Sequence, residues 1–281
     1  MVVILDGKEV ARKIRQNLKE EVSKLKEEGI SPKLAVIMVG DDSASKIYVK
    51  NKSIACNEIG IEYEEYLLKE ETTMDELLSL IDKLNNDKAI NGILLQSPIP
   101  KNLDINEAFK AIDPIKDVDG FNPMNVGKLC LGQDAFISCT PYGVIKILED
   151  YNIEIEGKNA VIIGRSNIVG KPMLQCLLNK NATVTVCHSR TKNLAEITRM
   201  ADILVVAIGK SKFVTKDMVK DGAVVVDVGI NRGEDGKLCG DVDFEEVSKV
   251  ASYITPVPGG VGPMTIAMLM NNIVKATKLQ N

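Results

Sequence analysis

The chain has 281 residues, which is enough for about two domains of ordinary size. Its 45% hydrophobic and 26% charged residues are typical of a globular protein, and its net charge of 35 − 39 = −4 lacks the basic excess with which nucleic-acid-binding proteins meet phosphates. No apolar run is long enough to span a bilayer and residues 1–6 are too short for a signal peptide, so we expect no nucleic-acid partner, no membrane partner and a cytoplasmic location.

The elements predicted for the first half alternate between helix and strand. The apolar spacing of Val10, Ile14, Leu18 and Val22 predicts a helix over residues 7–28, and Thr73 and Glu76 form a capping box. Further helices are predicted at 43–58 and 73–84, and strands at 34–39, 61–68 and 90–95. This alternation predicts a mostly parallel sheet covered by helices.

Regularity falls between residues 96 and 139, where only a short helix around 104–112 is predicted. Thr140 and Pro141 begin a helix that runs to about Asp150. A second series follows, with strands predicted at 159–163, 183–187, 203–206 and 223–228, helices at 170–179 and 192–200, and a final helix from 263. The fold class is therefore α/β with two domains, of which the second is of the Rossmann type.

The thiols and the single histidine give no sign of a metal site. Six cysteines are scattered along the chain without a C-x-x-C pair, and His188 is the only histidine. We therefore expect reduced, mostly buried thiols, no disulfide framework and no metal. We assign His188 a structural position at a strand end and no chemical role.

A buried strand that ends at Gly164 and leads into a helix is a candidate dinucleotide site. Such a junction directs backbone N–H groups and the positive end of a helix toward a pyrophosphate. The match to G-x-G-x-x-G is weak, because Ser166 replaces the middle glycine and Gly170 comes one position late. An ordinary strand-to-helix turn stays open as the alternative.

The end of the next strand favours NADP over NAD as the cofactor. NAD-binding units place an acidic residue about 20 positions on, whereas this strand ends in His188, Ser189 and Arg190. A hydroxyl and a guanidinium suit a 2′-phosphate, and Arg165 could reach the same group. The alternative is that Arg190 is a solvated loop residue. Ile230, after a later strand, is placed to contact the nicotinamide side, or simply to pack its loop.

Three polar residues in the first half are candidates for chemistry. Lys52 lies in line with Tyr48 and Ala55 on one helix face, and a partly buried lysine can act as a base or proton shuttle. Gln96 ends a strand where a side chain projects from a sheet, and Asp119 suits the amino group and ring N–H of an aminopyrimidinone. The alternatives are a lysine that covers apolar surface and an acidic turn at Asp117 and Asp119.

Seven segments together resemble the bifunctional methylenetetrahydrofolate dehydrogenase/cyclohydrolase family. They occur in family order and cover most of the chain: Tyr48–Lys52, Gln96–Pro100, Asp117–Gly120, Cys139–Pro141, Gly164–Pro172, Gly240–Asp243 and Pro256–Thr265. Each motif alone is weak, whereas the ordered set is specific. Tyr142 departs from the family, because many members have lysine there.

The resemblance implies roles for individual residues. Lys52 would be the catalytic lysine with Gln96 beside it, Tyr48 would stack on the folate, and Asp119 would hold the pterin. NADP would contact the residues of the glycine turn and of two later strand ends, which are Gly164, Arg165, Ser166, Ser189 and Ile230. Pro258 and Gly259 would contact the substrate.

The resemblance also implies the organisation and the reaction. Residues 1–140 would form a folate-binding catalytic domain on which the helix 263–281 packs, residues 141–262 a Rossmann-type NADP-binding domain, with a cleft between them. The enzyme would oxidise 5,10-methylenetetrahydrofolate with NADP and hydrolyse methenyltetrahydrofolate to 10-formyltetrahydrofolate, and it would be a homodimer. The rival hypotheses are a dehydrogenase without the hydrolytic step and a non-catalytic NADP-binding protein.

Overall fold

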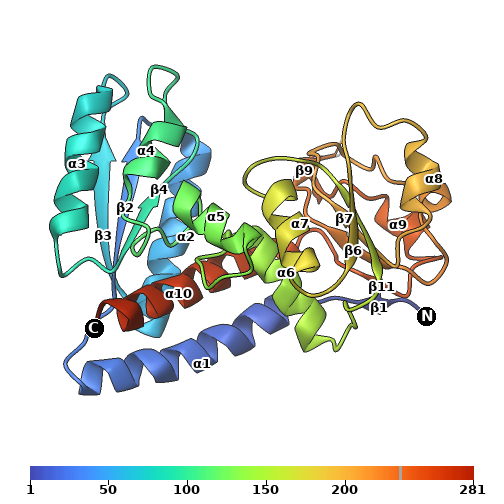
Figure 1. The fold of residues 1–281 in the computed structure, drawn as a ribbon, viewed down its shortest axis with the longest axis horizontal. Coiled ribbons are helices and arrows are strands. Elements are labelled where there is room, and N and C mark those ends of the chain that lie inside the picture. Colours follow the sequence, from blue (N-terminus) through green and yellow to red (C-terminus); the bar gives the residue numbers. More distant parts are fainter. Residues whose placement is uncertain (234–235) are drawn as a thin grey trace. The chain divides into compact units, whose positions relative to one another are not determined.

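The computed structural model describes residues 1–233 and 236–281, and they form two compact units (Figure 1). The small-sheet unit consists of Lys13–Ile137 and Ile266–Asn281, and the large-sheet unit of Met1–Arg12 and Ser138–Thr265. Each unit has a parallel sheet of its own. The predicted α/β class with two domains is thereby confirmed.

The small-sheet unit is built on three parallel strands in the order β3-β2-β4. These are β2 (Lys33–Val39), β3 (Glu62–Leu68) and β4 (Gly92–Leu95). Residues 34–39 of the central strand are all buried, as a strand covered on both faces should be. Its helices are α2 (Ser43–Ile59), α3 (Met74–Asn86), α4 (Ile105–Ala111) and α5 (Pro123–Cys130), with most of α1 (Gly7–Glu27) and α10 (Val261–Gln280).

Local chemistry sets the ends of the helices that carry or support the candidate site. Asp42 caps α2 by accepting a hydrogen bond from the Ser45 N–H at 2.7 Å, and Gly60, at φ 86°, ends it. The predicted capping box of α3 is confirmed, with Thr73 and Glu76 bonded reciprocally. Helix α2 therefore begins and ends at residues that the sequence specifies locally.

Helix α5 was not predicted, and it lies in the stretch that looked irregular. Asn122 caps it by accepting from the Met124 N–H at 2.8 Å, and Pro123 stands in its first turn. Eight residues are too few to display a clear helical period. The cap and the proline were the available signals.

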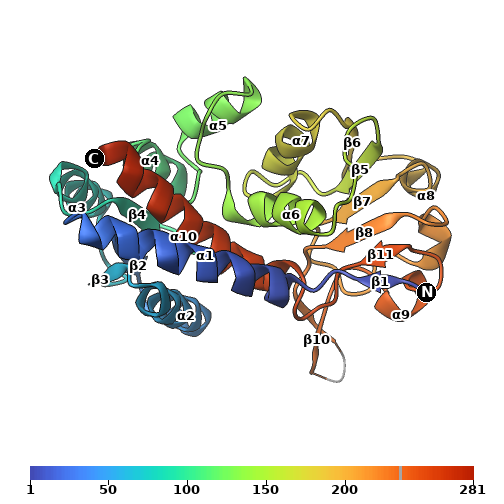
Figure 2. The same cartoon turned by 90° about the horizontal axis from the view of Figure 1, so that it is seen from below.

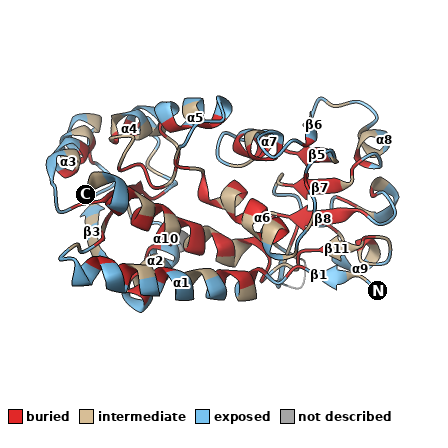
Figure 3. Ribbon diagram, turned by 60° about the horizontal axis from the view of Figure 1, so that its bottom comes forward, coloured by how far each residue is buried: buried red, intermediate tan, exposed pale blue. Residues whose placement is uncertain are grey.

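The large-sheet unit is built on six parallel strands in the order β1-β11-β8-β7-β5-β6. They are β1 (Val3–Ile4), β5 (Asn159–Ile163), β6 (Thr183–Cys187), β7 (Ile203–Val206), β8 (Val224–Asp227) and β11 (Tyr253–Ile254). Figure 3 shows the buried central strands β7 and β8. The first strand of the chain is thus an edge of the sheet that the second half builds, because β1 pairs with β11.

Helices and one hairpin complete this unit. They are α6 (Cys139–Asp150), α7 (Gly170–Leu178), α8 (Leu194–Thr198), the 3-10 turn Lys216–Met218, α9 (Phe244–Val247), β9 (Asn231–Arg232) and β10 (Leu238–Cys239). Strands β9 and β10 pair antiparallel and extend away from the large sheet (Figure 2). Apolar side chains of β5, β7 and β8 pack with those of α8 and α9 in one buried cluster. Over the described ranges, no helix is long and apolar enough to cross a bilayer.

Candidate active-site residues

The structure brings Lys52 and Gln96 together, although 44 positions separate them in sequence. Lys52 Nζ donates a hydrogen bond to Gln96 Oε1 at 2.9 Å. Gln96 directly follows β4 and is 8% exposed; its backbone N–H donates to the Ile37 carbonyl at 2.8 Å. Its Nε2 donates to the Ser97 carbonyl at 2.6 Å, so the side-chain amide is oriented with its oxygen toward the amine. These hydrogen bonds fix the Gln96 amide and, through it, the position of the Lys52 amine.

Exposure falls along the α2 face that carries Lys52. Tyr48, one turn earlier, is half-exposed, so its ring is open to a planar ligand. Cys56, one turn later, is fully buried, and its Sγ lies 3.7 Å from Met270 Sδ. Burial raises the pKa of the Cys56 thiol to about 12, while the nearby charge of Lys52 acts in the opposite direction. Lys52 is half-buried between these positions, which is a suitable place for an amine that exchanges protons with a ligand.

Ser45 belongs to the same helix face and was not singled out from the sequence. It precedes Tyr48 by three positions and Lys52 by seven, which are helical spacings. Its hydroxyl is buried, and it has no hydrogen-bond partner among the described residues. A buried hydroxyl in that position is a candidate ligand contact, and the spacing was the signal that could have found it.

The acidic turn separates into a structural acid and a candidate ligand-binding acid. Asp117 is 1% exposed and accepts hydrogen bonds from the backbone N–H groups of Phe121 and Asn122 and from Asn125 Nδ2. Burial raises the pKa of Asp117, and these donors oppose the shift. Asp119 is half-buried and directly follows Val118, whose carbonyl accepts from Asn272 Nδ2 at 2.8 Å. The turn is therefore fixed on both sides of Asp119.

Lys116 anchors the start of this turn and was missed by sequence reasoning. It is 5% exposed, and its Nζ donates to the carbonyls of Leu84 and Asp87 at the end of α3, at 3.0 and 2.7 Å. Its own carbonyl accepts from the Ile93 N–H of β4 at 2.8 Å. Burial lowers the pKa of this lysine. A lysine is rarely buried, so the residue type gave no signal in the sequence.

In the large-sheet unit, the turn between β5 and α7 requires its glycines. Gly164 has φ 123°, and a Cβ there would lie 2.3 Å from the Ala207 carbonyl oxygen. A Cβ on Gly170 would lie 2.3 Å from the Gly164 carbonyl oxygen. Ser166 Oγ accepts from the N–H groups of Val169 and Gly170 at 3.2 and 3.4 Å, so its side chain shapes the turn. The backbone is thus tightly folded where a pyrophosphate would approach.

The end of β6 presents the residues that we expect to meet a 2′-phosphate. Ser189 and Arg190 are both exposed. His188 is structural here: its N–H donates to Thr191 Oγ1 at 2.8 Å, and its Nδ1 accepts from the Arg190 N–H at 3.1 Å. With Arg165, also exposed, these side chains supply the hydroxyl and cations that fit a phosphate. The residues present therefore fit NADP.

The loop that carries Ile230 follows a buried carboxylate, that of Asp227. Asp227, at the end of β8, is 3% exposed and accepts from the N–H groups of Gly229, Asp241 and Val242 at 2.9, 3.0 and 2.8 Å. Burial raises its pKa to about 6. Ile230 follows Gly229 in this loop and is 53% exposed, so its side chain is accessible for an apolar contact with a ligand.

The substrate-contact candidates Pro258 and Gly259 lie in a loop that packs on the start of the chain. Gly259 has φ 110°, and its carbonyl accepts from the Lys8 N–H at 3.1 Å. A Cβ on Gly7 would lie 1.8 Å from the Gly260 carbonyl oxygen. Pro258 is exposed. Residues at opposite ends of the chain thus shape this loop.

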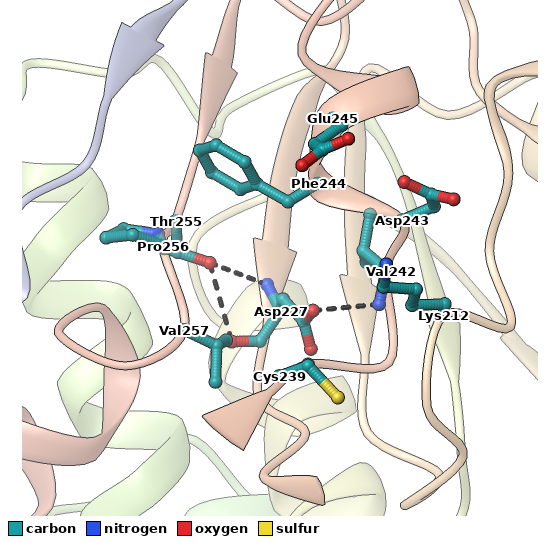
Figure 4. A pocket seen from close by; sticks show the side chains of 11 residues that line it. Lys212, Asp227, Cys239, Val242, Asp243, Phe244, Glu245, Thr255, Pro256 and Val257 are labelled. Atoms are coloured by element: carbon teal, nitrogen blue, oxygen red, sulfur yellow. Dashed lines mark hydrogen bonds between the residues drawn. The ribbon is translucent and has the colours of Figure 1, made fainter. Parts of the chain in front are cut away.

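A separate pocket lies beside the ends of β8 and β11 (Figure 4). Asp227 and Thr255 line it and are joined by a 2.8 Å hydrogen bond from the Asp227 N–H to Thr255 Oγ1, and Phe244 and Cys239 also line it. None of the site residues predicted from the sequence lines this pocket. Within the described residues, no group of three or more His, Cys, Asp or Glu side chains could hold a metal ion.

Comparisons with known proteins match almost the whole length of the chain. Residues 5–119 match the family model "Tetrahydrofolate dehydrogenase/cyclohydrolase, catalytic domain", and residues 138–281 match "Tetrahydrofolate dehydrogenase/cyclohydrolase, NAD(P)-binding domain". A curated relative from Campylobacter concisus, named bifunctional protein FolD, is 60% identical, with 98% of this chain and 97% of the relative covered.

Solved structures agree with the family models. The Campylobacter jejuni bifunctional enzyme FolD, a methylenetetrahydrofolate dehydrogenase/cyclohydrolase, superposes with a TM-score of 0.99 at 55% identity, covering 100% of both chains. The Trypanosoma brucei enzyme, complexed with NADP cofactor and inhibitor, gives a TM-score of 0.93 at 37% identity, covering 99% of this chain and 98% of that one.

Proposed function

Because this chain belongs to the tetrahydrofolate dehydrogenase/cyclohydrolase family, we propose that it oxidises 5,10-methylenetetrahydrofolate with NADP and then hydrolyses methenyltetrahydrofolate to 10-formyltetrahydrofolate. The matched families cover both units, and the relatives are matched over almost their whole length. Both reactions interconvert one-carbon units carried by folate.

In the oxidation, the chain's task is to hold two planar groups in register. NADP, when bound, supplies the acceptor for the hydride that leaves the methylene bridge. Gly164 admits the pyrophosphate close to the backbone, and Ser166, Ser189, Arg165 and Arg190 surround the phosphates with donors. Ile230 offers an exposed apolar contact to the nicotinamide side.

In the hydrolysis, Lys52 moves the proton. Water adds to the methenyl carbon, and one of its two protons passes to the amine of Lys52, which leaves a neutral hydroxyl adduct. One C–N bond of the five-membered ring then breaks: the hydroxyl becomes the carbonyl of the formyl group on N10, and its proton passes to the ring nitrogen that leaves. The positive charge of the methenyl cation thus ends as the proton on Lys52, which is released to solvent. Gln96, bonded to Lys52 at 2.9 Å, keeps the amine directed at the reacting carbon.

The substrate itself is held by groups of different chemistry. Tyr48 stacks on the folate, and Asp119 accepts hydrogen bonds from the amino group and ring N–H of the pterin. Pro258 and Gly259 contact the substrate through the loop that Lys8 anchors. Asp117 has no direct role, because its carboxylate is occupied by the turn.

The observation that supports this proposal most strongly is the hydrogen bond between Lys52 and Gln96. A spectrophotometric assay of methylenetetrahydrofolate with NADP, repeated with NAD, tests the oxidation and the cofactor preference. A second assay of methenyltetrahydrofolate without cofactor tests the hydrolysis. No absorbance change in the first would leave a non-catalytic NADP-binding protein, and activity in the first alone would leave a dehydrogenase without the hydrolytic step.

We further propose that the protein is a cytoplasmic homodimer. Light scattering of the purified chain checks the assembly, with an expected mass of 2 × 30.7 kDa rather than 30.7 kDa. A monomer at micromolar concentration would contradict the dimer.

A further inference from the structure

Asp241 is a buried carboxylate to which neither reaction step above gives a role. It is 0% exposed, and it lies in the segment between β10 and α9. Its Oδ2 accepts from the N–H groups of Ile208 and Gly209 at 2.7 and 3.0 Å, and its Oδ1 accepts from the Lys210 N–H at 2.8 Å. Three consecutive amides that converge on one carboxylate form a concave anion-binding turn, here filled by the protein's own side chain.

The same carboxylate also reaches the next loop along the sheet. Asn231 Nδ2 donates to Asp241 Oδ1 at 2.9 Å, and a Cβ on Gly229 would lie 2.2 Å from the Asp241 carboxyl carbon. Asp241 therefore ties the loop after β7 to the loop after β8. Ile230 lies between these two contacts, so its position depends on both.

The two loops lie side by side at the carboxyl ends of adjacent strands. In the register of the sheet, Ile163 of β5 is opposite Val206 of β7, and Val206 is opposite Asp227 of β8. Ligands of open parallel sheets bind at this edge. The Gly164 turn follows β5 there, and a Cβ on Gly164 would lie 2.3 Å from the Ala207 carbonyl oxygen.

A second carboxylate holds Asp241 in place. Asp227 accepts from the Asp241 N–H, and a Cβ on Gly240 would lie 1.8 Å from Asp227 Oδ2. No side chain other than hydrogen fits at Gly240 or Gly229 without displacing a carboxylate. Asp227 thus fixes the segment that carries Asp241, and Asp241 in turn fixes the loops after β7 and β8.

We propose that Asp241 is a positioning residue for NADP, which sets the loops 207–210 and 228–231 without touching the cofactor. This inference rests on the proposed function. Because Asp241 occupies the N–H groups of Ile208, Gly209 and Lys210, these donors are not available to a ligand, and the exposed side chain of Ile230 is the group that meets the nicotinamide half. An amide in place of the carboxylate turns one acceptor into a donor that faces two N–H donors.

The test compares Asp241→Asn with Asp202→Asn. Asp202 is the matched control, because it lies just before β7, at the amino ends of the strands of the same sheet. Its carboxylate accepts a hydrogen bond from the Asn159 N–H at 2.9 Å and forms an ion pair with Lys220. For Asp241→Asn we expect the Kd and KM for NADP to rise about tenfold or more, with kcat within about threefold, because a lost charge-assisted contact typically costs that much. Asp202→Asn should leave both unchanged.

Two further readouts do not depend on the cofactor-loaded enzyme. Amide hydrogen exchange of residues 208–210 in the absence of NADP should accelerate in Asp241→Asn and not in Asp202→Asn. Hydrolysis of methenyltetrahydrofolate without NADP should stay within about twofold of wild type, since Lys52 and Gln96 belong to the other unit. Asn231→Ala, which removes one donor from Asp241, is the milder variant if Asp241→Asn does not fold, with an expected rise in Kd of a few fold.

The outcomes of these experiments distinguish failure of this inference from failure of the proposed function. Unchanged NADP affinity with accelerated exchange would overturn the inference, because the loops would then not serve the cofactor. Equal losses of hydrolysis and NADP affinity in Asp241→Asn would show a folding defect, and Asn231→Ala would then decide: an unchanged Kd for NADP in that variant would overturn the inference. Failure of the wild-type protein to bind NADP would refute the proposed function instead, so the two failures are distinguishable.

Discussion

At the scale of single residues, the proposed chemistry depends on how far each polar group is removed from water. On α2, the exposed ring of Tyr48, the half-buried amine of Lys52 and the buried thiol of Cys56 follow one another at one-turn intervals. The raised thiol pKa of about 12 makes Cys56 inert as a nucleophile near neutral pH. The amine is thus the reactive group of this face.

Replacing Lys52 by Met should separate hydrolysis from cofactor binding. Lys52→Met removes the proton carrier, so the hydrolysis of methenyltetrahydrofolate should fall by about 10²-fold or more, the usual contribution of a general acid or base. NADP affinity, measured by calorimetry, should not change. Lys50→Met, which alters an exposed lysine of the same helix, is the control and should keep both. Retained hydrolysis in Lys52→Met would refute its role.

Asp227 should make stability depend on pH between 5 and 7.5. Burial raises its folded pKa to about 6 from 3.8, so the folded state binds the proton more tightly and loses stability as the pH rises through 6. Relative to Asp227→Asn, which does not titrate, the wild-type free energy of unfolding should fall by about 1 kcal/mol across this range. Urea titrations at both pH values measure the difference. A constant difference would show that Asp227 is ionised with an ordinary pKa.

At the scale of elements, the turn between β5 and α7 is closely packed against neighbouring backbone. Gly164 and Gly170 approach other backbone atoms so closely that no side chain fits. Ser166 closes the turn from the side. The strand, turn and helix therefore act as one rigid element, which is what close approach of a pyrophosphate needs.

Adding one methyl group to this turn should reduce both stability and cofactor binding. In Gly170→Ala, the new Cβ would meet the Gly164 carbonyl at 2.3 Å, and a backbone atom cannot move aside as a side chain can. We expect a loss of about 1–3 kcal/mol in the free energy of unfolding and weaker NADP binding. Gly127→Ala in α5 is the matched control, because its Cβ meets nothing within 4 Å. That variant should be neutral or more stable by about 0.5–1 kcal/mol. Equal behaviour of the two variants would contradict the crowding argument.

At the scale of the whole molecule, NADP should stabilise the fold in proportion to its affinity. A ligand that binds only the folded state adds about 2.7 kcal/mol at 100 times its Kd, which raises the Tm of a protein of this size by several degrees. NADP should raise the Tm more than NAD at equal concentration, because only NADP carries the 2′-phosphate. In Arg190→Ala the difference between the two cofactors should shrink. Equal shifts with NAD and NADP in the wild-type protein would contradict the predicted cofactor preference.

The sequence by itself determined the α/β class, most of the helices and strands, and the family. Apolar periodicity and local caps such as that at Thr73 are properties of neighbouring residues, so they can be read without the fold. The cap predicted at Thr140 was wrong, because α6 already begins at Cys139 and its N-cap is Ser138, which makes no side-chain cap hydrogen bond. The family motifs are also short runs of neighbouring residues, so they too can be recognised without the fold. Helix α5 was missed because a helix of two turns is too short to show its period.

Only the tertiary structure decided which distant residues meet. The pairing of β1 with β11, the bond between Lys52 and Gln96, and the burial of Lys116 and Asp241 join parts of the chain that no local pattern relates. A buried charge looks like any surface charge in the sequence, because its burial depends on partners supplied by remote segments. Local propensity specifies the elements, whereas the packing of remote segments specifies the environment in which each polar group must function.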